Sequence, residues 1–155
     1  MLNVSLLSAN DLLNQISNIV HQETQLHDDH IDLTVSEVHK VSGAGYLDFG
    51  GSEFKPAITE KITPEKRRSD DDYGWWKLGN GPFRIIFNES LTLESSQTGI
   101  ISSHRHSRQS GLVSNTNLIS SEDNQERLSM NITVSEAGCN IKENARIATL
   151  RVLEN

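Results

Sequence analysis

Residues 75–101 read WWKLGNGPFRIIFNESLTLESSQTGII, a run of short apolar segments separated by polar turns. Within it Phe83, Ile85 and Phe87 alternate with Arg84 and Asn88. Successive side chains of a strand point to opposite faces, so this period-two pattern predicts a strand with one buried face. The Gly-Asn-Gly-Pro sequence at 79–82 predicts the turn before that strand. Short strands bounded by turn residues are typical of a β-sandwich or β-barrel.

The same pattern continues on both sides of this stretch. Further strands are predicted at 31–35, 46–49, 128–134 and 145–153. Before them, apolar residues at helical spacing predict a helix over 8–20, with Ser8 as its cap. Residues 52–73 contain two prolines and a charged run, which predicts a long solvated loop. No repeat or linker is evident, so we expect residues 1–155 to form a single, mainly β domain.

Composition and charge exclude several classes of protein. The 155 residues include 14 Lys and Arg against 21 Asp and Glu, a net charge of -7. Repulsion between like charges disfavours binding to nucleic acid or to an anionic membrane, and we expect neither partner. No apolar run approaches the roughly 20 residues that a membrane-spanning helix needs. The single cysteine and the absence of a recognisable signal peptide predict a cytoplasmic protein.

Basic and hydroxyl side chains gather at 104–110, His-Arg-His-Ser-Arg-Gln-Ser, although the chain as a whole is acidic. Arginine and hydroxyl groups suit phosphate oxygens, which favours a phosphate site. An exposed basic loop is the alternative. A metal site is another, because His104 and His106 would share one face of a strand, although the neighbouring arginines oppose a cation. His27 and His30, which flank two aspartates, invite the same metal interpretation against that of solvated or hydrogen-bonded histidines.

Carboxylates gather in a second polar segment, Ser-Ser-Glu-Asp-Asn-Gln-Glu at 120–126. They could hold Mg²⁺ through water or supply a general base, and a solvated loop is the alternative. The sequence contains no phosphate-binding glycine loop, no zinc-binding cysteine pair and no nucleophile elbow.

Five segments follow one another in a distinctive order: IDLTV at 31–35, YLDF at 46–49, WKL at 76–78 with Gly81, FRIIFNE at 83–89 and NARIA at 144–148. In this order and spacing they resemble the dUTPase and dCTP deaminase superfamily, especially its archaeal-type branch, and the resemblance extends over residues 6–153. The resemblance implies a dUTPase-like distorted β-barrel of jelly-roll type with a short N-terminal helix. It also implies a homotrimer with sites at subunit interfaces, a deoxyuridine or deoxycytidine triphosphate substrate, and Mg²⁺.

The segment that aligns with the family's phosphate-binding motif differs most from the family pattern. Members carry P-R-S-S-L-L-R-x-G, and residues 103–111 align with that motif so that only Gly111 is retained. A one-residue slip would place Arg105 on the arginine and Ser107 on the second serine. The basic residues available to bind phosphate are His104, Arg105, His106 and Arg108.

The catalytic positions of the family also depart. Ser120 aligns with the water-activating aspartate of dUTPase-like members, and a hydroxyl is a poor base near neutral pH. The glutamate of deaminase-like members falls in 128–132, which contains no carboxylate. Glu122 or Asp123 could replace the missing base if the loop is shifted. Asp32 persists, and the resemblance implies that it contacts Mg²⁺ through water.

Three functions remain open at this level. The first is a catalytically degenerate member of the superfamily that acts as a binding or regulatory trimer. The second is a divergent but active dUTP diphosphatase, which would hydrolyse dUTP to dUMP and pyrophosphate with Mg²⁺. The third is a scaffold or partner-binding protein that takes no nucleotide.

Overall fold

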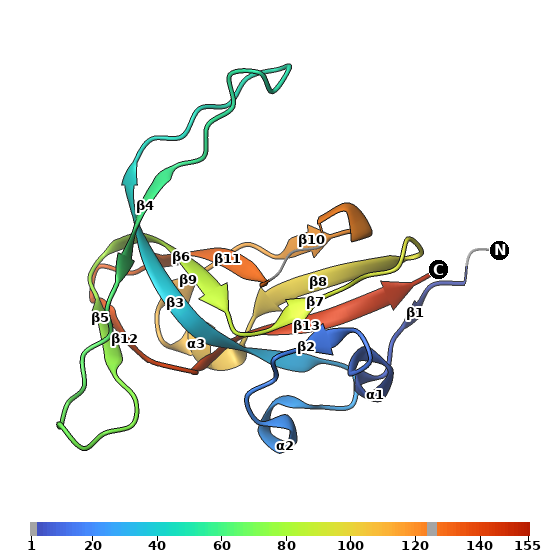
Figure 1. Cartoon of the computed structure of the whole chain (residues 1–155), viewed down its shortest axis with the longest axis horizontal. Helices are drawn as coiled ribbons and strands as arrows, with labels where there is room; N and C mark the ends of the chain where they lie inside the picture. The colour runs from blue at the N-terminus through green and yellow to red at the C-terminus, as the bar shows by residue number, and fades with distance from the viewer. Residues whose placement is uncertain (1–2, 124–126) are drawn as a thin grey trace.

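The computed structural model describes residues 3–123 and 127–155, and it is mainly β, as predicted (Figure 1). One large sheet has the strand order β10-β8-β13-β3-β6-β11-β9, with β1 added to β13 and β4 added to β3. Two-stranded pairs β12-β5 and β2-β7 complete the strands of the described residues. The strands of the large sheet are β1 Ser5–Leu6, β3 Ile31–Gly43, β4 Ile58–Ile62, β6 Gly81–Phe87, β8 Gln97–Ser103, β9 Leu112–Val113, β10 Asn117–Ile119, β11 Ser129–Val134 and β13 Arg146–Glu154.

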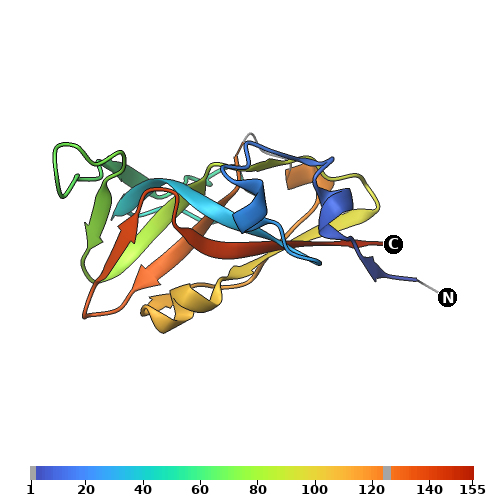
Figure 2. The same cartoon turned by 90° about the horizontal axis from the view of Figure 1, so that it is seen from below.

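The strands β3 and β13 lie side by side in antiparallel register through the middle of the molecule (Figure 2). Ile31, Leu33 and Val35 of β3 are buried in the core, as their alternation predicts. Register shifts interrupt β3 beside β6 and β13 beside β3. Such bulges bend a strand and increase its twist, so they fit the curled half-barrel that the sheet forms. The predicted mainly β, barrel-like class is therefore confirmed.

The N-terminal helix is much shorter than the predicted span of 8–20. The helix α1 covers Ala9–Leu12, and Ser8 caps it by accepting a hydrogen bond from the Asp11 backbone N–H at 3.2 Å. The chain then turns into β2, Ile16–Ser17, which pairs with β7, Ser90–Leu91. Ile16, one of the apolar residues whose spacing predicted the longer helix, lies in this strand instead, because pairing with β7 holds the chain in extended form. A second helix, α2, covers Gln22–Gln25.

A long arm leaves the sheet between β3 and β4 and extends away from the rest of the molecule (Figure 1). The strand predicted at 46–49 is absent there, and only a single bridge joins Tyr46 to Lys55. The loop predicted at 52–73 is also wrong in part, because β4 lies within it and pairs with β3. Pro56 and Pro64 flank β4 without interrupting it, so the prolines do not remove any hydrogen bond of the ladder.

The remaining elements are a pair of short strands and two short helices. The strands β5, Trp75–Leu78, and β12, Cys139–Lys142, form a pair, while a helix α3, Arg105–Gln109, follows β8 directly. A short 3-10 helix η1 covers Ser121–Asp123. No helix in the described ranges, 3–123 and 127–155, is long and apolar enough to cross a membrane.

Acid is expected to destabilise the fold through Glu37 on β3. Its carboxylate is hydrogen-bonded by His39, Arg127 and Lys61, and these contacts lower the pKa of Glu37 from 4.5 to about 2. The folded state therefore holds this group ionised, and the stabilisation is present above pH 4.5 and lost as the pH falls toward 2. Because two of these partners are exposed, we expect roughly 1 kcal/mol. Urea unfolding at pH 6 and pH 3 should show a smaller acid effect in Glu37→Gln than in the parent, and equal effects would contradict this.

Candidate functional site

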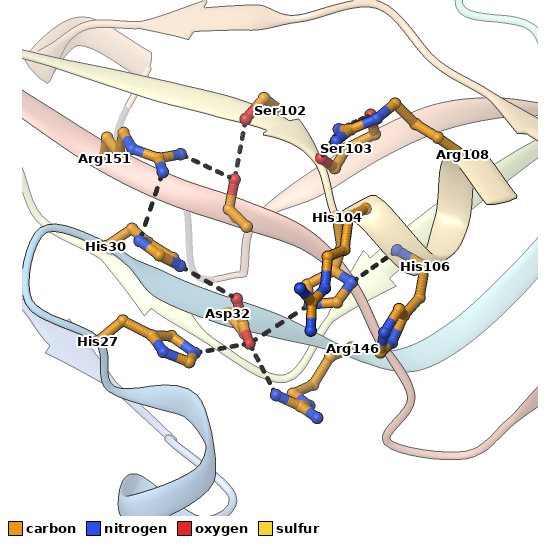
Figure 3. A pocket seen from close by; sticks show the side chains of 12 residues that line it. His27, His30, Asp32, Ser102, Ser103, His104, His106, Arg108, Arg146 and Arg151 are labelled. Atoms are coloured by element: carbon orange, nitrogen blue, oxygen red, sulfur yellow. Dashed lines mark hydrogen bonds and ion pairs between the residues drawn. The ribbon is translucent and has the colours of Figure 1, made fainter.

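A pocket of about 440 Å³ lies where β3, β8 and β13 meet the start of α3 (Figure 3). Its lining is strongly basic although the chain carries a net charge of -7. The lining comprises four arginines (Arg105, Arg108, Arg146, Arg151), four histidines (His27, His30, His104, His106), three hydroxyl residues (Ser102, Ser103, Thr149) and Asp32. Such a concentration of donors favours an anionic ligand.

The floor of the pocket is a row of polar residues across three neighbouring strands. Asp32 on β3 lies opposite Thr149 on β13, and Thr149 lies opposite Ser102 on β8. The Ser102 and Thr149 hydroxyls are hydrogen-bonded at 2.8 Å, and Arg151 donates to the Thr149 hydroxyl at 3.3 Å. Antiparallel pairing thus brings together groups that are far apart along the chain.

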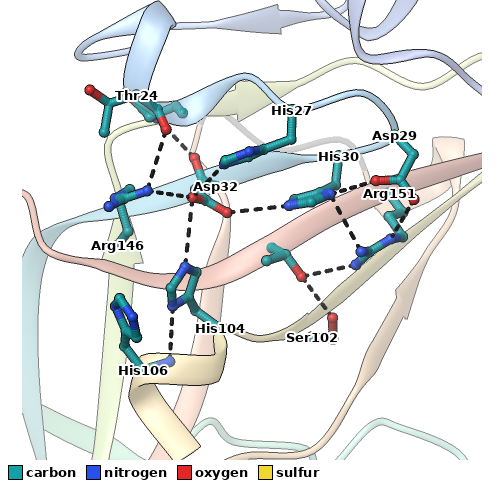
Figure 4. A network of polar contacts seen from close by, with 12 residues as sticks. Thr24, His27, Asp29, His30, Asp32, Ser102, His104, His106, Arg146 and Arg151 are labelled. Carbon is teal, nitrogen blue, oxygen red and sulfur yellow. Dashed lines mark hydrogen bonds and ion pairs between the residues drawn. The ribbon is translucent and has the colours of Figure 1, made fainter.

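The carboxylate of Asp32 is the centre of the polar network (Figure 4). The residue is only 1% exposed. Its Oδ2 accepts hydrogen bonds from Arg146 and from His27 Nε2, each at 3.0 Å. Its Oδ1 is buried and has no hydrogen-bond partner among the described residues. The carboxylate is therefore held firmly on one side and unsatisfied on the other.

His104 stands between Asp32 and α3. Its Nδ1 accepts the backbone N–H of His106 at 3.1 Å, so the ring caps α3, and its Nε2 lies 3.7 Å from Asp32 Oδ2. Burial lowers the pKa of His104, against the opposing effect of Asp32. The neutral ring then carries its proton on Nε2, because Nδ1 is used as the acceptor. His104 therefore presents an N–H toward Asp32 rather than a basic nitrogen.

His30 is fixed from the other side of the pocket. Its Nδ1 lies 2.6 Å from Asp29 Oδ1, and this hydrogen bond is the main reason that the pKa of Asp29 is lowered. Arg151 approaches the same aspartate at 3.7 Å. The rings of His27 and His30 are stacked, with centroids 4.5 Å apart.

A buried hydrogen-bond network lies behind the pocket. Glu89, which is fully buried, accepts from Gln25 Nε2 at 2.7 Å, from the Thr34 backbone N–H at 3.0 Å and from the Thr34 hydroxyl. Gln25 also donates to the backbone carbonyl of Asp32 at 2.9 Å. Burial raises the pKa of Glu89. This network connects α2, and the segment that leads to His27, with the strand that carries Asp32.

The four predicted phosphate residues, His104, Arg105, His106 and Arg108, all line this one pocket together with Asp32. Their segment forms the short helix α3 with His104 at its cap, so the strand arrangement considered for a His104 and His106 metal pair is wrong. The rings of His104 and His106 contact each other edge to face.

The predicted catalytic acids lie elsewhere. Glu122 and Asp123 belong to η1, and neither lines the pocket. The Asp123 carboxylate accepts from the Ser120 backbone N–H at 2.9 Å and from its hydroxyl at 3.1 Å. The other residues of this acidic segment, 124–126, lie outside the described residues.

Sequence reasoning assigned no role to several residues of the pocket. Thr149 and Arg151 alternate with the apolar residues of β13, so their period of two could have placed them on one polar face. Arg146 begins the same strand and was matched to the family only as part of a motif. Glu89 gave no signal of its own, because a glutamate at the end of a strand is usually solvated.

The fold and the pocket define a curled β protein with a cationic pocket suited to an anionic ligand. No family model matches the chain. It is 29% identical over 154 residues to the probable deoxyuridine 5'-triphosphate nucleotidohydrolase of Methanosarcina mazei and 28% identical to that of Methanosarcina acetivorans. Each comparison covers 95% of this chain and 86% of the relative.

The fold is also that of a solved enzyme structure, the 2'-deoxycytidine 5'-triphosphate deaminase of Agrobacterium tumefaciens. The TM-score is 0.70 with 10% sequence identity, over 98% of this chain and 49% of that one, so the chain spans about half of the deaminase's length. By sequence the chain is thus similar to probable dUTPases, and by fold it is similar to a dCTP deaminase.

Proposed function

We propose that this protein binds a deoxyuridine or deoxycytidine triphosphate through its phosphates in the basic pocket and does not hydrolyse it efficiently. The observation that carries the proposal is the composition of the pocket, with four arginines and a single carboxylate. That carboxylate, Asp32, is already paired with Arg146 and His27. As far as residues 3–123 and 127–155 form it, the site is thus equipped to hold an anion and lacks a free base.

The proposed phosphate contacts follow from exposure. Arg105 and Arg108 are exposed on α3 at the edge of the pocket, where they can reach a ligand. Guanidinium groups bind phosphate oxygens in pairs of hydrogen bonds, and Ser102 and Ser103 add hydroxyl donors. Arg108 at present donates to the Ser103 carbonyl at 2.8 Å, a contact that a phosphate oxygen would replace.

Magnesium fits this pocket only together with the nucleotide. Mg²⁺ prefers six oxygen ligands, and the pocket offers one carboxylate, whose Oδ1 has no hydrogen-bond partner. Asp32 would hold the ion through that oxygen or an intervening water, while the phosphates supply the remaining ligands. When bound, the ion would neutralise phosphate charge.

The loss of hydrolysis is proposed from the positions of the acids. An attacking water needs a base within hydrogen-bond reach, and Glu122 and Asp123 do not line the pocket of their own chain. Loss of a general base alone lowers the rate by about 10²–10⁴-fold. We therefore favour a binding or regulatory role over catalysis.

A second candidate, an active dUTP diphosphatase, is favoured by the similarity to the two probable deoxyuridine 5'-triphosphate nucleotidohydrolases of Methanosarcina. Glu122 and Asp123 are exposed, so in a homotrimer they could serve the pocket of a neighbouring copy. This alternative makes catalysis depend on assembly. It predicts pyrophosphate release from dUTP that is lost when both acids are changed to alanine.

The deciding experiment combines turnover with ligand-induced stabilisation. With Mg²⁺, we expect no pyrophosphate release from dUTP or dCTP above background, and a rise in melting temperature with a non-hydrolysable dUTP analogue. Changing both Arg105 and Arg108 to alanine should abolish that rise. Arg67→Ala, which removes an arginine that does not line the pocket, should leave the rise unchanged. Turnover that depends on Glu122 and Asp123 would establish the alternative. Absence of any shift with deoxynucleotides would leave the scaffold function.

We also propose a homotrimer. Several large apolar side chains are exposed on the arm between β3 and β4, namely Tyr46, Leu47, Phe49 and Phe54. Exposed apolar groups gathered on one segment commonly mark an interaction surface. Light scattering should give three times the chain mass of 17.3 kDa, and a stable monomer would contradict the proposal.

A further inference from the structure

We propose that His27, His30 and Asp32 form a binding site for a divalent transition-metal ion, with Zn²⁺ as the representative ion. The proposal concerns the protein without nucleotide, so it does not rest on the proposed function. The proposed ion is bound mainly by imidazole nitrogens, and it is distinct from a Mg²⁺ ion that binds together with the nucleotide phosphates.

The three donor atoms are already close together. One ring nitrogen of His27, one of His30 and a carboxylate oxygen of Asp32 all lie within 4.8 Å of one another. His27 Nε2 is 3.0 Å from Asp32 Oδ2, and His30 Nε2 is 3.7 Å from Oδ1. Ligands of a tetrahedral zinc ion at about 2.0–2.1 Å lie roughly 3.4 Å from one another. Small side-chain rotations, together with a shift of the His27 proton from Nε2 to Nδ1, therefore suffice to form the site (Figure 4).

The hydrogen bond from His30 Nδ1 to Asp29 leaves the other ring nitrogen of His30, Nε2, available as a metal ligand. A carboxylate only accepts hydrogen bonds, so the 2.6 Å contact places the proton of His30 on Nδ1. The Nε2 atom of the neutral ring then carries a lone pair that points toward Asp32. Arg151 lies 3.4 Å from the same Nδ1, a contact that cannot be a second hydrogen bond when that nitrogen is the donor. Metal-binding histidines are commonly oriented in this way by a carboxylate.

The second observation is the unsatisfied oxygen of Asp32. Oδ1 is buried, the residue is 1% exposed, and the atom has no hydrogen-bond partner among the described residues. It faces His30 Nε2 at 3.7 Å, so two electron-pair donors point at each other across an empty gap. A buried carboxylate oxygen without a partner is costly, and a cation bound between the two atoms removes that cost.

The ligand set selects the class of ion. Two imidazoles and one carboxylate suit Zn²⁺, Fe²⁺ and similar ions, whereas Mg²⁺ prefers oxygen ligands alone. Arg146 pairs with Asp32 Oδ2 and leaves Oδ1 to the ion, and Arg151 pairs with Asp29. With three protein ligands the ion keeps an open position, which is typical of exchangeable or catalytic sites. That position faces the pocket, because all three residues line it.

The test is a Zn²⁺ titration of untagged, chelator-treated protein, read by competition with a chromogenic chelator. We expect one Zn²⁺ per chain, with no displacement by millimolar Mg²⁺. His30→Ala should weaken binding by at least about 100-fold, and Asp29→Asn, which weakens the orienting bond and the pairing with Arg151, by about 10-fold. The matched control is His39→Ala, a histidine of β3 that does not line the pocket, which should bind normally. Cys139→Ser controls for the lone thiol.

Cobalt provides a readout of the ligand geometry. Co²⁺ in place of Zn²⁺ should give visible absorption bands of a low-coordinate site, and both His27→Ala and His30→Ala should remove them. Circular dichroism shows whether each variant is folded, and the Asp29→Asn change, in a half-exposed side chain, keeps the test valid if a histidine variant is not. Failure to bind Zn²⁺, or binding that is unchanged in His30→Ala and Asp29→Asn, would overturn the proposal.

Discussion

Glu89→Ala is expected to lower the free energy of unfolding by about 3–5 kcal/mol, because it removes the acceptor of a fully buried network. The Thr34 backbone N–H and the Gln25 side-chain amide would lose their acceptor where water cannot replace it. The deleted side chain would also leave a cavity. Urea unfolding at neutral pH measures this, with Glu60→Ala on the exposed strand β4 as the matched control, expected within about 0.5 kcal/mol of the parent.

The charge of Glu89 gives this prediction a pH dependence. Burial raises the pKa of Glu89 above its ordinary value of 4.5, so the folded state binds the proton more tightly than the unfolded state. The contribution of this group is therefore greatest below pH 4.5 and declines as the pH rises through the raised folded value. A loss below about 1 kcal/mol in Glu89→Ala would show that the network does not stabilise the fold.

Arg146→Met is expected to cost about 2–3 kcal/mol, because it removes one of the two hydrogen-bond donors to the buried Asp32 carboxylate. Among the residues that the structure describes, His27 would remain as the only donor within hydrogen-bond distance of that carboxylate. Methionine preserves much of the apolar stem, so the change reports on the charge rather than on packing. Chemical unfolding at pH 7 is the measurement. Arg108→Met, which removes contacts to Ser103 on the exposed rim, should change stability by less than about 0.5 kcal/mol.

A double-mutant cycle separates pairing from other effects. In an Asp32→Asn background the buried charge is absent, and Arg146→Met should then cost less than about 1 kcal/mol. An equal cost in both backgrounds would mean that Arg146 stabilises the chain through its other contact, the Thr24 carbonyl at 3.3 Å, or through packing. The cycle therefore tests directly whether Asp32 depends on this arginine.

The sequence predicted local structure well where one pattern had one physical explanation. The alternation at 83–87 and 128–134 became β6 and β11, which pair with each other, and Ser8 caps a helix as expected. The helix over 8–20 failed because its apolar spacing also fits a helical turn followed by a strand. Pairing between β2 and β7, separated by some seventy residues, decided between the two.

The residues of the candidate site were likewise predictable from the sequence only in part. The segment 104–108 was recognisable as a phosphate candidate because cationic side chains concentrated there stand out in an acidic chain. Its partners on β13, Thr149 and Arg151, share a polar face that alternation could have revealed. The acids Glu122 and Asp123 were selected by charge alone, and charge does not locate a side chain relative to a pocket.

The sequence by itself determined that the chain is built from short strands, which residues of each strand share a face, and where cationic side chains concentrate. Only the tertiary structure decided that the polar face of β3 is buried. Asp32 alternates with apolar residues as a solvated residue would, yet it is covered, because Thr149, Ser102 and the histidines at 27, 30 and 104 close over it. Periodicity fixes the face on which a residue lies, whereas the neighbours of that face depend on long-range strand pairing, which no local pattern encodes.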